Sequence, residues 1–221
     1  MTVNSLLSIH HLARDFVVID KPAGLRSVPA RGSDTDPSLA DSVETRVRET
    51  FDRPNNPVTV HRLDRDTSGL MVLALTRKAH RALSRQFMHR KVGKSYAALL
   101  EGDAVGDEGK VDLPLHVDWP NRPLQCVNHQ HGRPATTLWR ITQRLTSPAR
   151  TRVSFRPETG RTHQLRVHAA TPRSLGGLGC PILGDDLYGT PGARLHLHAD
   201  TLAFWEPHTG QWAKFHSPAP F

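Results

Sequence analysis

The chain has 221 residues, 37% of them hydrophobic, which suits one large domain or two small ones with a buried core. No run nears the roughly 20 apolar residues of a membrane-spanning helix, and the first residues lack the pattern of a signal peptide. The net charge of +8 favours a polyanionic partner such as nucleic acid, although charge alone leaves a merely soluble basic protein equally open.

The first quarter of the chain predicts a strand followed by a helix. Residues 15–20 hold an apolar run between two aspartates and predict a buried strand, which ends in the turn 21–24. Asp36 followed by Pro37 predicts a helix start. Apolar residues then recur at four-residue steps along one face, at Leu39, Val43, Val47 and Phe51. Residues 53–57 contain two prolines and are expected to break this helix.

A densely charged loop and an apolar strand come next. Residues 61–70 read HRLDRDTSGL, and residues 71–76 form an apolar run that ends in a helix-start signal. Charges at this density usually lie in a solvated loop. Here a predicted core strand fixes the backbone of the loop, and catalytic groups are often found on loops held by scaffold strands. Residues 61–70 are therefore the candidate site, with a solvated loop as the alternative.

The middle of the chain predicts a basic helix and several strands. Thr76 is expected to cap a helix whose inner stripe is Ala79, Leu83 and Phe87. Its outer face is basic, at Arg77, Lys78, Arg81, Arg85 and Arg90. Further elements follow in order: a strand at 94–100, a Gly/Asp loop at 102–109, an irregular stretch at 112–134, and paired strands at 136–145 and 151–156.

The last third of the chain predicts one short helix and two strands. The expected elements are a helix at 163–170, a flexible connection at 176–179, and strands at 195–204 and 212–215. Strands occur both in hairpins and around helices, so we expect an α+β fold with a mixed, mostly antiparallel sheet flanked by helices and loops. No clean domain boundary is evident. We expect a short N-terminal extension at 1–15 and a single domain at 16–221.

Five segments together resemble one known family. Residues 61–70 resemble the catalytic motif of the RluA-type pseudouridine synthases. The other segments match that family's motifs in the same order: 18–25 (VIDKPAGL), 94–96 (KSY), 161–168 (RTHQLRVH) and 181–189 (PILGDDLYG). The resemblance implies a pseudouridine synthase fold around a central RNA-binding cleft. We expect no S4 domain of the kind found in some relatives, because only about 15 residues precede the first strand.

The resemblance implies an isomerase without a cofactor. Pseudouridine synthesis breaks the bond from ribose C1′ to uracil N1, turns the base over and joins C1′ to C5, with no redox change. A carboxylate could act as a nucleophile or take a proton from the ribose, and both routes stay open. The resemblance implies that Asp64 is this carboxylate, that Arg166 pairs with it, and that Tyr96 stacks on the uracil. From the residues alone, a solvated Arg166 and a core Tyr96 are the commoner interpretations.

Six further residues are expected to bind substrate. They are His61, Arg62, Arg65, Arg161, His163 and Leu183. Arg62 and Arg65 flank Asp64, and they suit phosphates or the gap left by a flipped base. Leu183 is expected in the apolar wall of the base pocket, with ordinary core as the alternative. The two histidines are expected to orient loops.

A metal site is not expected. The chain has 14 histidines, but His163 and His168 lie five apart, off a common helix face, and there is no HExxH or Cys/His cluster. The two cysteines, Cys126 and Cys180, make no disulfide framework, and with no export signal a reducing cytoplasm is expected. Asp66 is a rival to Asp64, but its position in the family motif is variable.

The RNA target depends on the stretch 114–123 and its continuation at 132–137. These residues resemble the dual-specificity subgroup of the family, which implies one target in a hairpin loop of 23S rRNA and one in the anticodon loop of tRNAs. The alternatives are a single-target synthase and a catalytically silent RNA-binding protein. Trp119 in this stretch could instead pack a proline-rich loop onto the sheet. The loop 171–180 is longer than expected, with Cys180 where the family has histidine. We expect a monomer.

Overall fold

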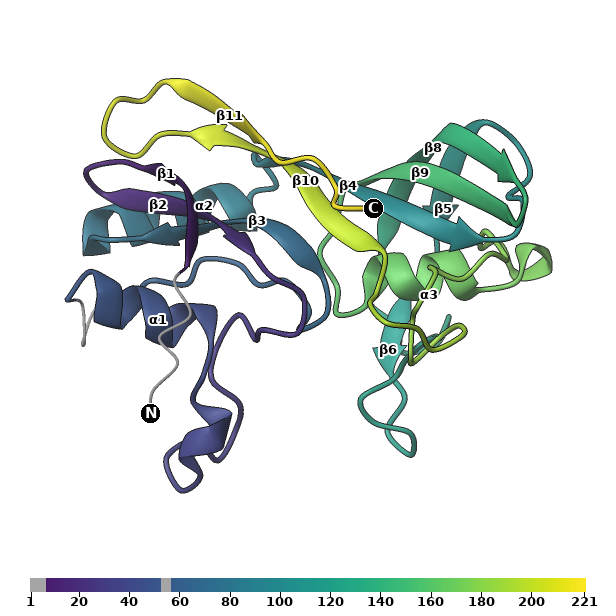
Figure 1. Ribbon diagram of the computed structural model, residues 1–221, viewed down its shortest axis with the longest axis horizontal. Coiled ribbons are helices and arrows are strands. Elements are labelled where there is room, and N and C mark those ends of the chain that lie inside the picture. The colour runs from purple at the N-terminus through teal and green to yellow at the C-terminus, as the bar shows by residue number, and fades with distance from the viewer. Residues whose placement is uncertain (1–6, 53–56) are drawn as a thin grey trace. The chain divides into compact units, whose positions relative to one another are not determined.

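The computed structural model describes residues 7–52 and 57–221 and consists of two compact units (Figure 1). The N-terminal unit comprises residues 1–93 and 199–218, and the central unit comprises residues 94–198 and 219–221. The chain leaves the N-terminal unit at the start of strand β4 and returns within β10. The single domain expected for residues 16–221 stays a prediction.

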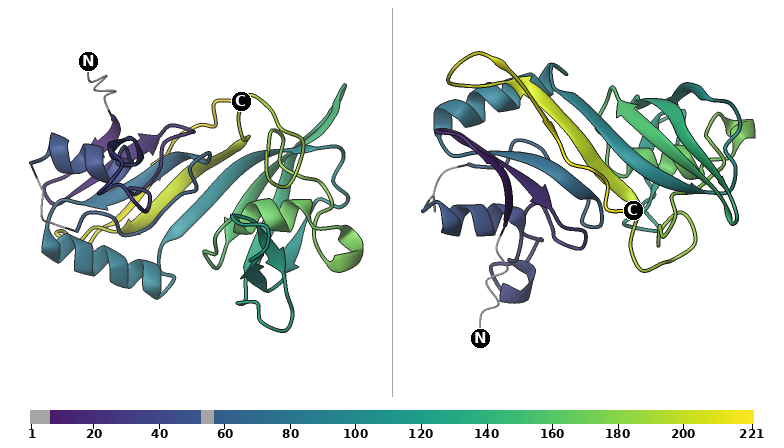
Figure 2. Two further views of the ribbon diagram at one scale, coloured as in Figure 1. Left: turned by 90° about the horizontal axis from the view of Figure 1, so that it is seen from below. Right: turned by 45° about the horizontal axis from the view of Figure 1, so that its top comes forward.

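The N-terminal unit is built on antiparallel strand pairs. Its strands are β1 (Ser8–Leu12), β2 (Phe16–Lys21), β3 (Ser68–Ala74), the second part of β10 (Leu197–Trp205) and β11 (Trp212–His216). β2 pairs with both β1 and β3, and β11 runs beside β10 (Figure 2). The predicted strands at 15–20, 195–204 and 212–215 are confirmed to within two residues. β1 lies inside residues 1–15, which were expected to be an extension. All of its residues are exposed, so no apolar face marks it as a strand in the sequence.

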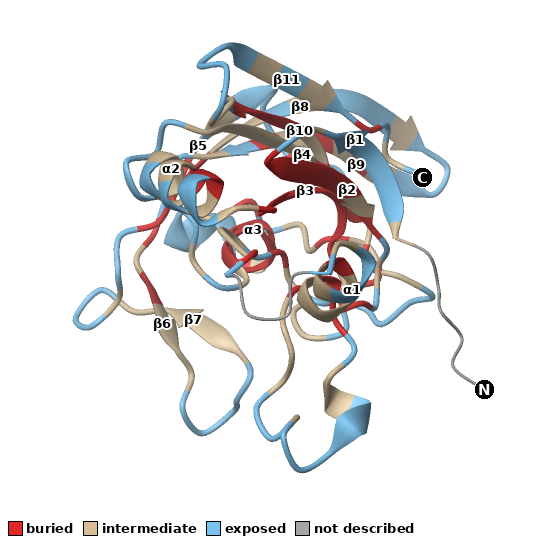
Figure 3. Cartoon of the chain, turned by 90° about the vertical axis from the view of Figure 1, so that its left-hand side faces the viewer, coloured by how far each residue is buried: buried red, intermediate tan, exposed pale blue. Residues whose placement is uncertain are grey.

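β3 is the most deeply buried strand of this unit. All seven of its residues are buried (Figure 3). At Gly69 (φ +111°) an added Cβ would lie only 2.4 Å from the carbonyl oxygen of Ala199 in β10. The glycine that ends the Thr-Ser-Gly sequence is therefore required, because only glycine allows this backbone approach.

The described residues of the N-terminal unit form two α-helices, and the first was predicted incorrectly. Instead of one helix from Asp36, the chain forms a short 3₁₀ turn, Pro37–Leu39, and then α1 (Val43–Thr50). The cause is a second cap: the Ser42 hydroxyl accepts a hydrogen bond from the Thr45 N–H and starts a new helix. Val43 and Val47 are fully buried, as their spacing predicted. Most of the expected break, at 53–56, lies outside the described residues.

The predicted second helix is confirmed as α2 (Arg77–Met88). The Thr76 hydroxyl accepts a hydrogen bond from the Ala79 N–H at 3.1 Å and caps the helix. Ala79 and Leu83 are fully buried against β2, β3 and β10 in the hydrophobic cluster of this unit. The basic residues face solvent. No helix in the described ranges is long and apolar enough to cross a bilayer.

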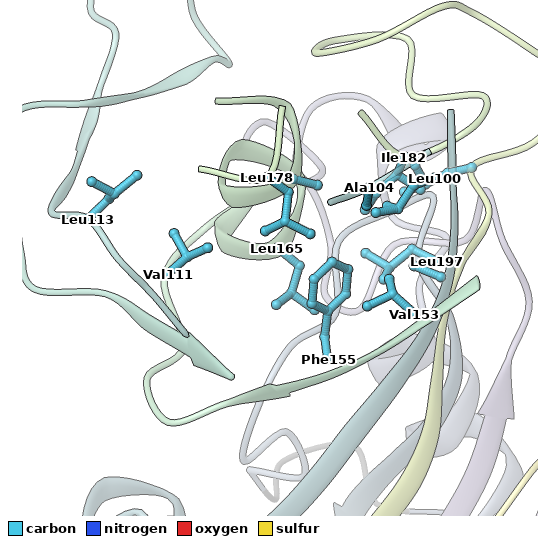
Figure 4. Packing of buried hydrophobic residues seen from close by; sticks show 13 residues of the cluster. Leu100, Ala104, Val111, Leu113, Val153, Phe155, Leu165, Leu178, Ile182 and Leu197 are labelled. Atoms are coloured by element: carbon cyan, nitrogen blue, oxygen red, sulfur yellow. The ribbon is translucent and has the colours of Figure 1, made fainter. Parts of the chain in front are cut away.

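The central unit contains an antiparallel sheet with one helix. Its strands are β4 (Gly93–Glu101), β9 (Ala149–Pro157), β8 (Thr136–Thr146) and β5 (Glu108–Asp112), hydrogen-bonded in that order. Leu165 of α3 (Gln164–Ala170) belongs to one hydrophobic cluster with Phe155, Ile182 and Leu197, and it lies beside Phe155 in Figure 4. The expected strands, the β8–β9 pair and the short helix are confirmed, and the architecture is α+β.

The stretch 112–134, expected to be irregular, contains a short hairpin. β6 (Leu115–Val117) pairs with β7 (Gln125–Val127), and both strands are only three residues long. A pattern of alternating polarity cannot be recognised over three residues, so these strands were missed. Trp119 in the connecting turn is 60% exposed, so packing of this residue onto the sheet is excluded.

Candidate active site

Asp64 lies half-buried on the loop before β3, and the backbone on both sides of it is anchored. The Ser27 hydroxyl donates to the carbonyl oxygen of Leu63 at 2.6 Å, and the Leu63 N–H donates back to the same hydroxyl at 3.0 Å. On the other side, the carbonyl oxygen of Arg65 accepts from the Gly24 N–H at 3.0 Å. The carboxylate is therefore presented from a fixed backbone.

Lys21 is the second anchor of this loop. Its ammonium donates to the carbonyl oxygens of Pro22, Leu25 and Arg65 at 2.8, 2.7 and 2.8 Å. Burial lowers the pKa of Lys21 to about 8, although the nearby carboxylates of Asp66 and Asp64 act to raise this pKa. From the sequence, Lys21 was expected in a turn within the matched segment 18–25, with no role of its own. The available signal was a lysine that closely follows the apolar run 16–19, since buried lysines are rare without partners.

The other charged residues of the loop differ in their surroundings. His61 stacks on Phe87 with ring centroids 4.4 Å apart, and its Nε2 accepts from the Val72 N–H at 3.1 Å. This geometry holds the loop against α2 and β3, in agreement with an orienting role. Arg65 forms a largely exposed ion pair with Asp66 at 3.0 Å, while Arg62 is exposed. Substrate binding by these residues stays a prediction.

In the central unit, Arg166 is the largest fully buried side chain, with 2% exposure. Its Nε and a terminal nitrogen form a fork with the two oxygens of Asp185 at 2.8 and 2.5 Å, and the same terminal nitrogen reaches Asp186 at 3.1 Å. Asp185 also accepts from the backbone N–H groups of Leu187 and Tyr188. Arg166 is therefore not a solvated helix residue. Its pairing with Asp64 stays a prediction.

Tyr188 joins Arg166 to the β6–β7 hairpin. Its ring lies 5.3 Å from the Arg166 guanidinium carbon, and its hydroxyl accepts from the Gln125 N–H at 2.7 Å. The hydroxyl also hydrogen-bonds His163 Nδ1 at 2.8 Å, and His163 holds a left-handed backbone (φ +52°) at the start of α3. Neither Tyr188 nor Asp185 was expected to have a role, although both lie in the matched segment 181–189.

Three polar side chains of α3 are buried: Gln164, Arg166 and His168. The Gln164 amide donates to Thr137 Oγ1, and its oxygen accepts from the Arg161 N–H at 3.0 Å. Arg161 Nε donates to the carbonyl oxygen of Pro134 at 3.1 Å. The helix is thus fixed to β8 through its own polar residues.

His168 gives this unit a predictable response to acid. Desolvation lowers the pKa of the ring to about 4, below its ordinary 6.5. Because the folded state resists protonation, we expect the free energy of unfolding to be highest above pH 6.5 and to fall by about 3 kcal/mol as the pH decreases to 4. Urea unfolding at several pH values measures this loss. His168→Gln, which cannot titrate, should lose less stability over that range, and equal losses in both proteins would contradict the assignment.

Tyr96 and Leu183 lie in different settings. Tyr96 is half-buried on β4, packs against the core cluster of the central unit and stands opposite Phe155 on β9. Leu183 lines an open cavity of about 490 Å³ together with Glu101, Arg150 and His196. Stacking of Tyr96 on a base, and a base pocket at Leu183, stay predictions.

Comparison with known proteins identifies the family. The family model "RNA pseudouridylate synthase" matches residues 15–171. The chain is 44% identical to the dual-specificity RNA pseudouridine synthase RluA of Pasteurella multocida, covering 97% of this chain and 94% of that protein. It is 43% identical to the protein of that name from Escherichia coli strain K12, covering 93% and 90%.

A solved structure agrees with this match. Human RNA pseudouridylate synthase domain containing 1 has a TM-score of 0.77 at 27% identity, covering all of this chain and 86% of that one. The chain therefore belongs to the RNA pseudouridylate synthase family, and it is an isomerase that acts on RNA.

Proposed function

We propose that the chain converts uridines in two RNA classes to pseudouridine, one in a hairpin loop of 23S rRNA and one in the anticodon loop of tRNAs. The observation that carries the proposal is Asp64 on a backbone anchored at both neighbours by Ser27, Lys21 and Gly24. The relatives named dual-specificity enzymes support two RNA classes. A monomer in the cytoplasm, working without metal or cofactor, is part of the proposal.

Asp64 is the catalytic carboxylate in this proposal. In one route an oxygen of Asp64 attacks ribose C1′ as the bond to uracil N1 breaks, and C5 of the rotated uracil then displaces the carboxylate. In the other route Asp64 removes a proton from the ribose and later returns it. Either route needs a carboxylate held within a fraction of an ångström of its working position, and the anchored backbone meets this need.

Residues of the central unit complete the proposed machinery. We propose that Arg166 pairs with Asp64, and that the Tyr96 ring stacks on the uracil. The Tyr96 hydroxyl takes the C5 proton as it releases its own proton to solvent, and N1, which left C1′ as an anion, takes up one proton in return. Arg62 and Arg65 would hold phosphates around the flipped nucleotide. Both targets are single-stranded loops, where a base is extruded at the least cost.

The test is pseudouridine mapping of total RNA from a strain that lacks this protein. We expect one uridine of 23S rRNA and one anticodon-loop uridine of tRNAs to lose the modification, and a plasmid copy to restore both. Loss at a single RNA would favour a single-target synthase. No loss in any RNA would favour a silent RNA-binding protein.

Lys21→Met is expected to slow catalysis more than it weakens RNA binding. The variant removes the donor shared by the carbonyl oxygens of Pro22, Leu25 and Arg65; that of Leu25 is buried, and that of Arg65 keeps the Gly24 N–H. Each buried unsatisfied group costs about 1–3 kcal/mol, and the loop that holds Asp64 would relax to recover hydrogen bonds. Single-turnover rates should fall roughly tenfold or more, with the dissociation constant for RNA changed much less.

The matched control for this variant is Lys110→Met. Lys110 is half-exposed and pairs only across the surface with Asp112 at 2.9 Å. The Lys110→Met variant should keep the wild-type single-turnover rate. A Lys21→Met protein with an unchanged single-turnover rate would show that the buried ammonium does not position Asp64.

Arg85→Glu on the basic face of α2 is expected to weaken binding to all RNAs about equally, since phosphate contacts carry little sequence information. α2 has no acidic residue in its first turn and begins with exposed Arg77 and Lys78, an arrangement that the helix dipole disfavours. The slope of log affinity against log salt should decrease by about one or more. Arg140→Glu, at another arginine that is 73% exposed, is the control. Equal effects of the two variants would exclude a specific role for α2.

A further inference from the structure

The turn of the β6–β7 hairpin carries an exposed aromatic ring that no step above uses. Trp119 is 60% exposed, and the guanidinium carbon of Arg122 lies 3.6 Å from the centroid of its ring. A guanidinium covers only one face of an indole, so much of the ring remains open to solvent. Figure 3 shows this turn as an exposed tip of the chain.

The turn is rigid despite its exposure. Asp118 N–H donates to the carbonyl oxygen of Leu124, and Leu124 N–H donates to that of Asn121, both at 3.0 Å. The Asn121 side chain donates to Asp118 Oδ2 at 3.0 Å. An aromatic ring on a fixed turn loses little conformational freedom on binding, which favours recognition by stacking.

The hairpin is joined to residues of the candidate site. At its base, Leu115 is buried with Val167 of α3 in one apolar cluster. At β7, the Gln125 N–H donates to the hydroxyl of Tyr188, whose ring lies 5.3 Å from the Arg166 guanidinium. The position of the turn is therefore fixed relative to α3 and Arg166 within the central unit.

We propose that Trp119, backed by Arg122, is a stacking platform for one unpaired base of the substrate RNA. The proposal rests on the proposed function, because it takes the RNA loop as the ligand. A single aromatic ring beside an arginine suits a base and its phosphate, since base–aromatic stacking tolerates any base and the guanidinium supplies charge. A protein partner would need a larger apolar patch, whereas the neighbours of Trp119 in the turn are Asp118, Asn121, Arg122 and two prolines.

The test measures the affinity of the full chain for a synthetic RNA hairpin with a seven-nucleotide, uridine-containing loop. Trp119→Ala should raise the dissociation constant roughly tenfold, and Trp119→Phe should restore most of the loss. Trp212→Ala, at an indole that is 47% exposed on β11, is the matched control and should bind like wild type. Unchanged affinity of Trp119→Ala would overturn the proposal.

Two further measurements separate stacking from other causes. Trp119→Ala should keep the wild-type salt slope, whereas Arg122→Gln should lower it by about one. In a second experiment the loop nucleotides are made abasic one at a time. At one position the missing base should weaken binding of the wild type, while binding of Trp119→Ala should not weaken further. The platform would be contradicted if no single position behaved in this way, or if Trp119→Ala lost as much affinity for fully paired RNA as for the hairpin. The second result would indicate a damaged fold.

The pseudouridine assay keeps this proposal separate from the proposed function. If the wild type forms pseudouridine and Trp119→Ala binds the hairpin as tightly as the wild type does, the platform is wrong and the proposed function stands. If wild type forms none while Trp119→Ala still loses loop affinity, the platform stands and the function is wrong.

Discussion

Asp64→Asn is expected to abolish pseudouridine formation while RNA binding survives. The amide has nearly the shape of the carboxylate, but it can neither attack C1′ nor accept a proton from the ribose, so the rate should fall by at least about a thousandfold. The fold should be preserved, because the loop is held through backbone groups of Leu63 and Arg65 rather than through the Asp64 side chain. Single-turnover assays and filter binding on one RNA measure the two quantities.

Asp66→Asn is the matched control for this experiment. Asp66 lies two residues away and pairs with the half-exposed Arg65, so its loss should change the rate by severalfold at most. Substantial activity in Asp64→Asn, or equal losses in the two variants, would show that Asp64 is not the essential carboxylate.

Arg166→Met is expected to lower both stability and activity. Removing the guanidinium leaves Asp185, which is 0% exposed, as a buried carboxylate without its cation. Breaking a buried pair in this way costs about 3–5 kcal/mol, which denaturant unfolding will measure. Asp186→Asn removes only the negative charge at the longer contact, 3.1 Å to a carboxylate that is 52% exposed, and should cost less than about 1 kcal/mol.

A double variant separates the two roles of Arg166. In Arg166→Met with Asp185→Leu both buried charges are gone, and stability should recover, since apolar replacement of a buried pair is often neutral. If Arg166 also acts on the reaction, the activity of the double variant will stay low by orders of magnitude. Recovery of activity together with stability would show that Arg166 serves only to hold Asp185.

The elements that could be predicted from the sequence are those with a strong local pattern. The strand at 16–21 begins with a continuous apolar run at 16–19, and α2 combines a threonine cap with a buried stripe. The division of the first helix could not be foreseen, because Asp36 and Ser42 are both good caps and only tertiary contacts decide that both are used. One such contact is the hydrogen bond from the Val43 N–H to the carbonyl oxygen of Arg26.

The site was predictable as a set of residues but less so as a set of contacts. Motif matching singled out Asp64, Tyr96 and Arg166, whereas Lys21 passed as a turn residue because its three acceptors are backbone carbonyls, which leave no trace in side-chain patterns. Likewise, sequence spacing cannot show that the Arg166 guanidinium forms two hydrogen bonds with the carboxylate of Asp185, 19 residues away. Such pairings depend on long-range packing.

The close approach of Gly69 to Ala199 has a consequence for synthesis of the protein. The unit that holds Asp64 takes two of its strands from residues 199–218, and the hydrophobic cluster behind β3 includes Leu202 and Phe204. A ribosome adding about 5–20 residues per second therefore needs many seconds after Asp64 emerges before these strands are available. Until then β3 lacks one neighbour, so the strand that follows the Asp64 loop is fully paired only after β10 has been synthesised. A nascent chain that has not yet added residues 199–218 therefore has an unfinished active unit.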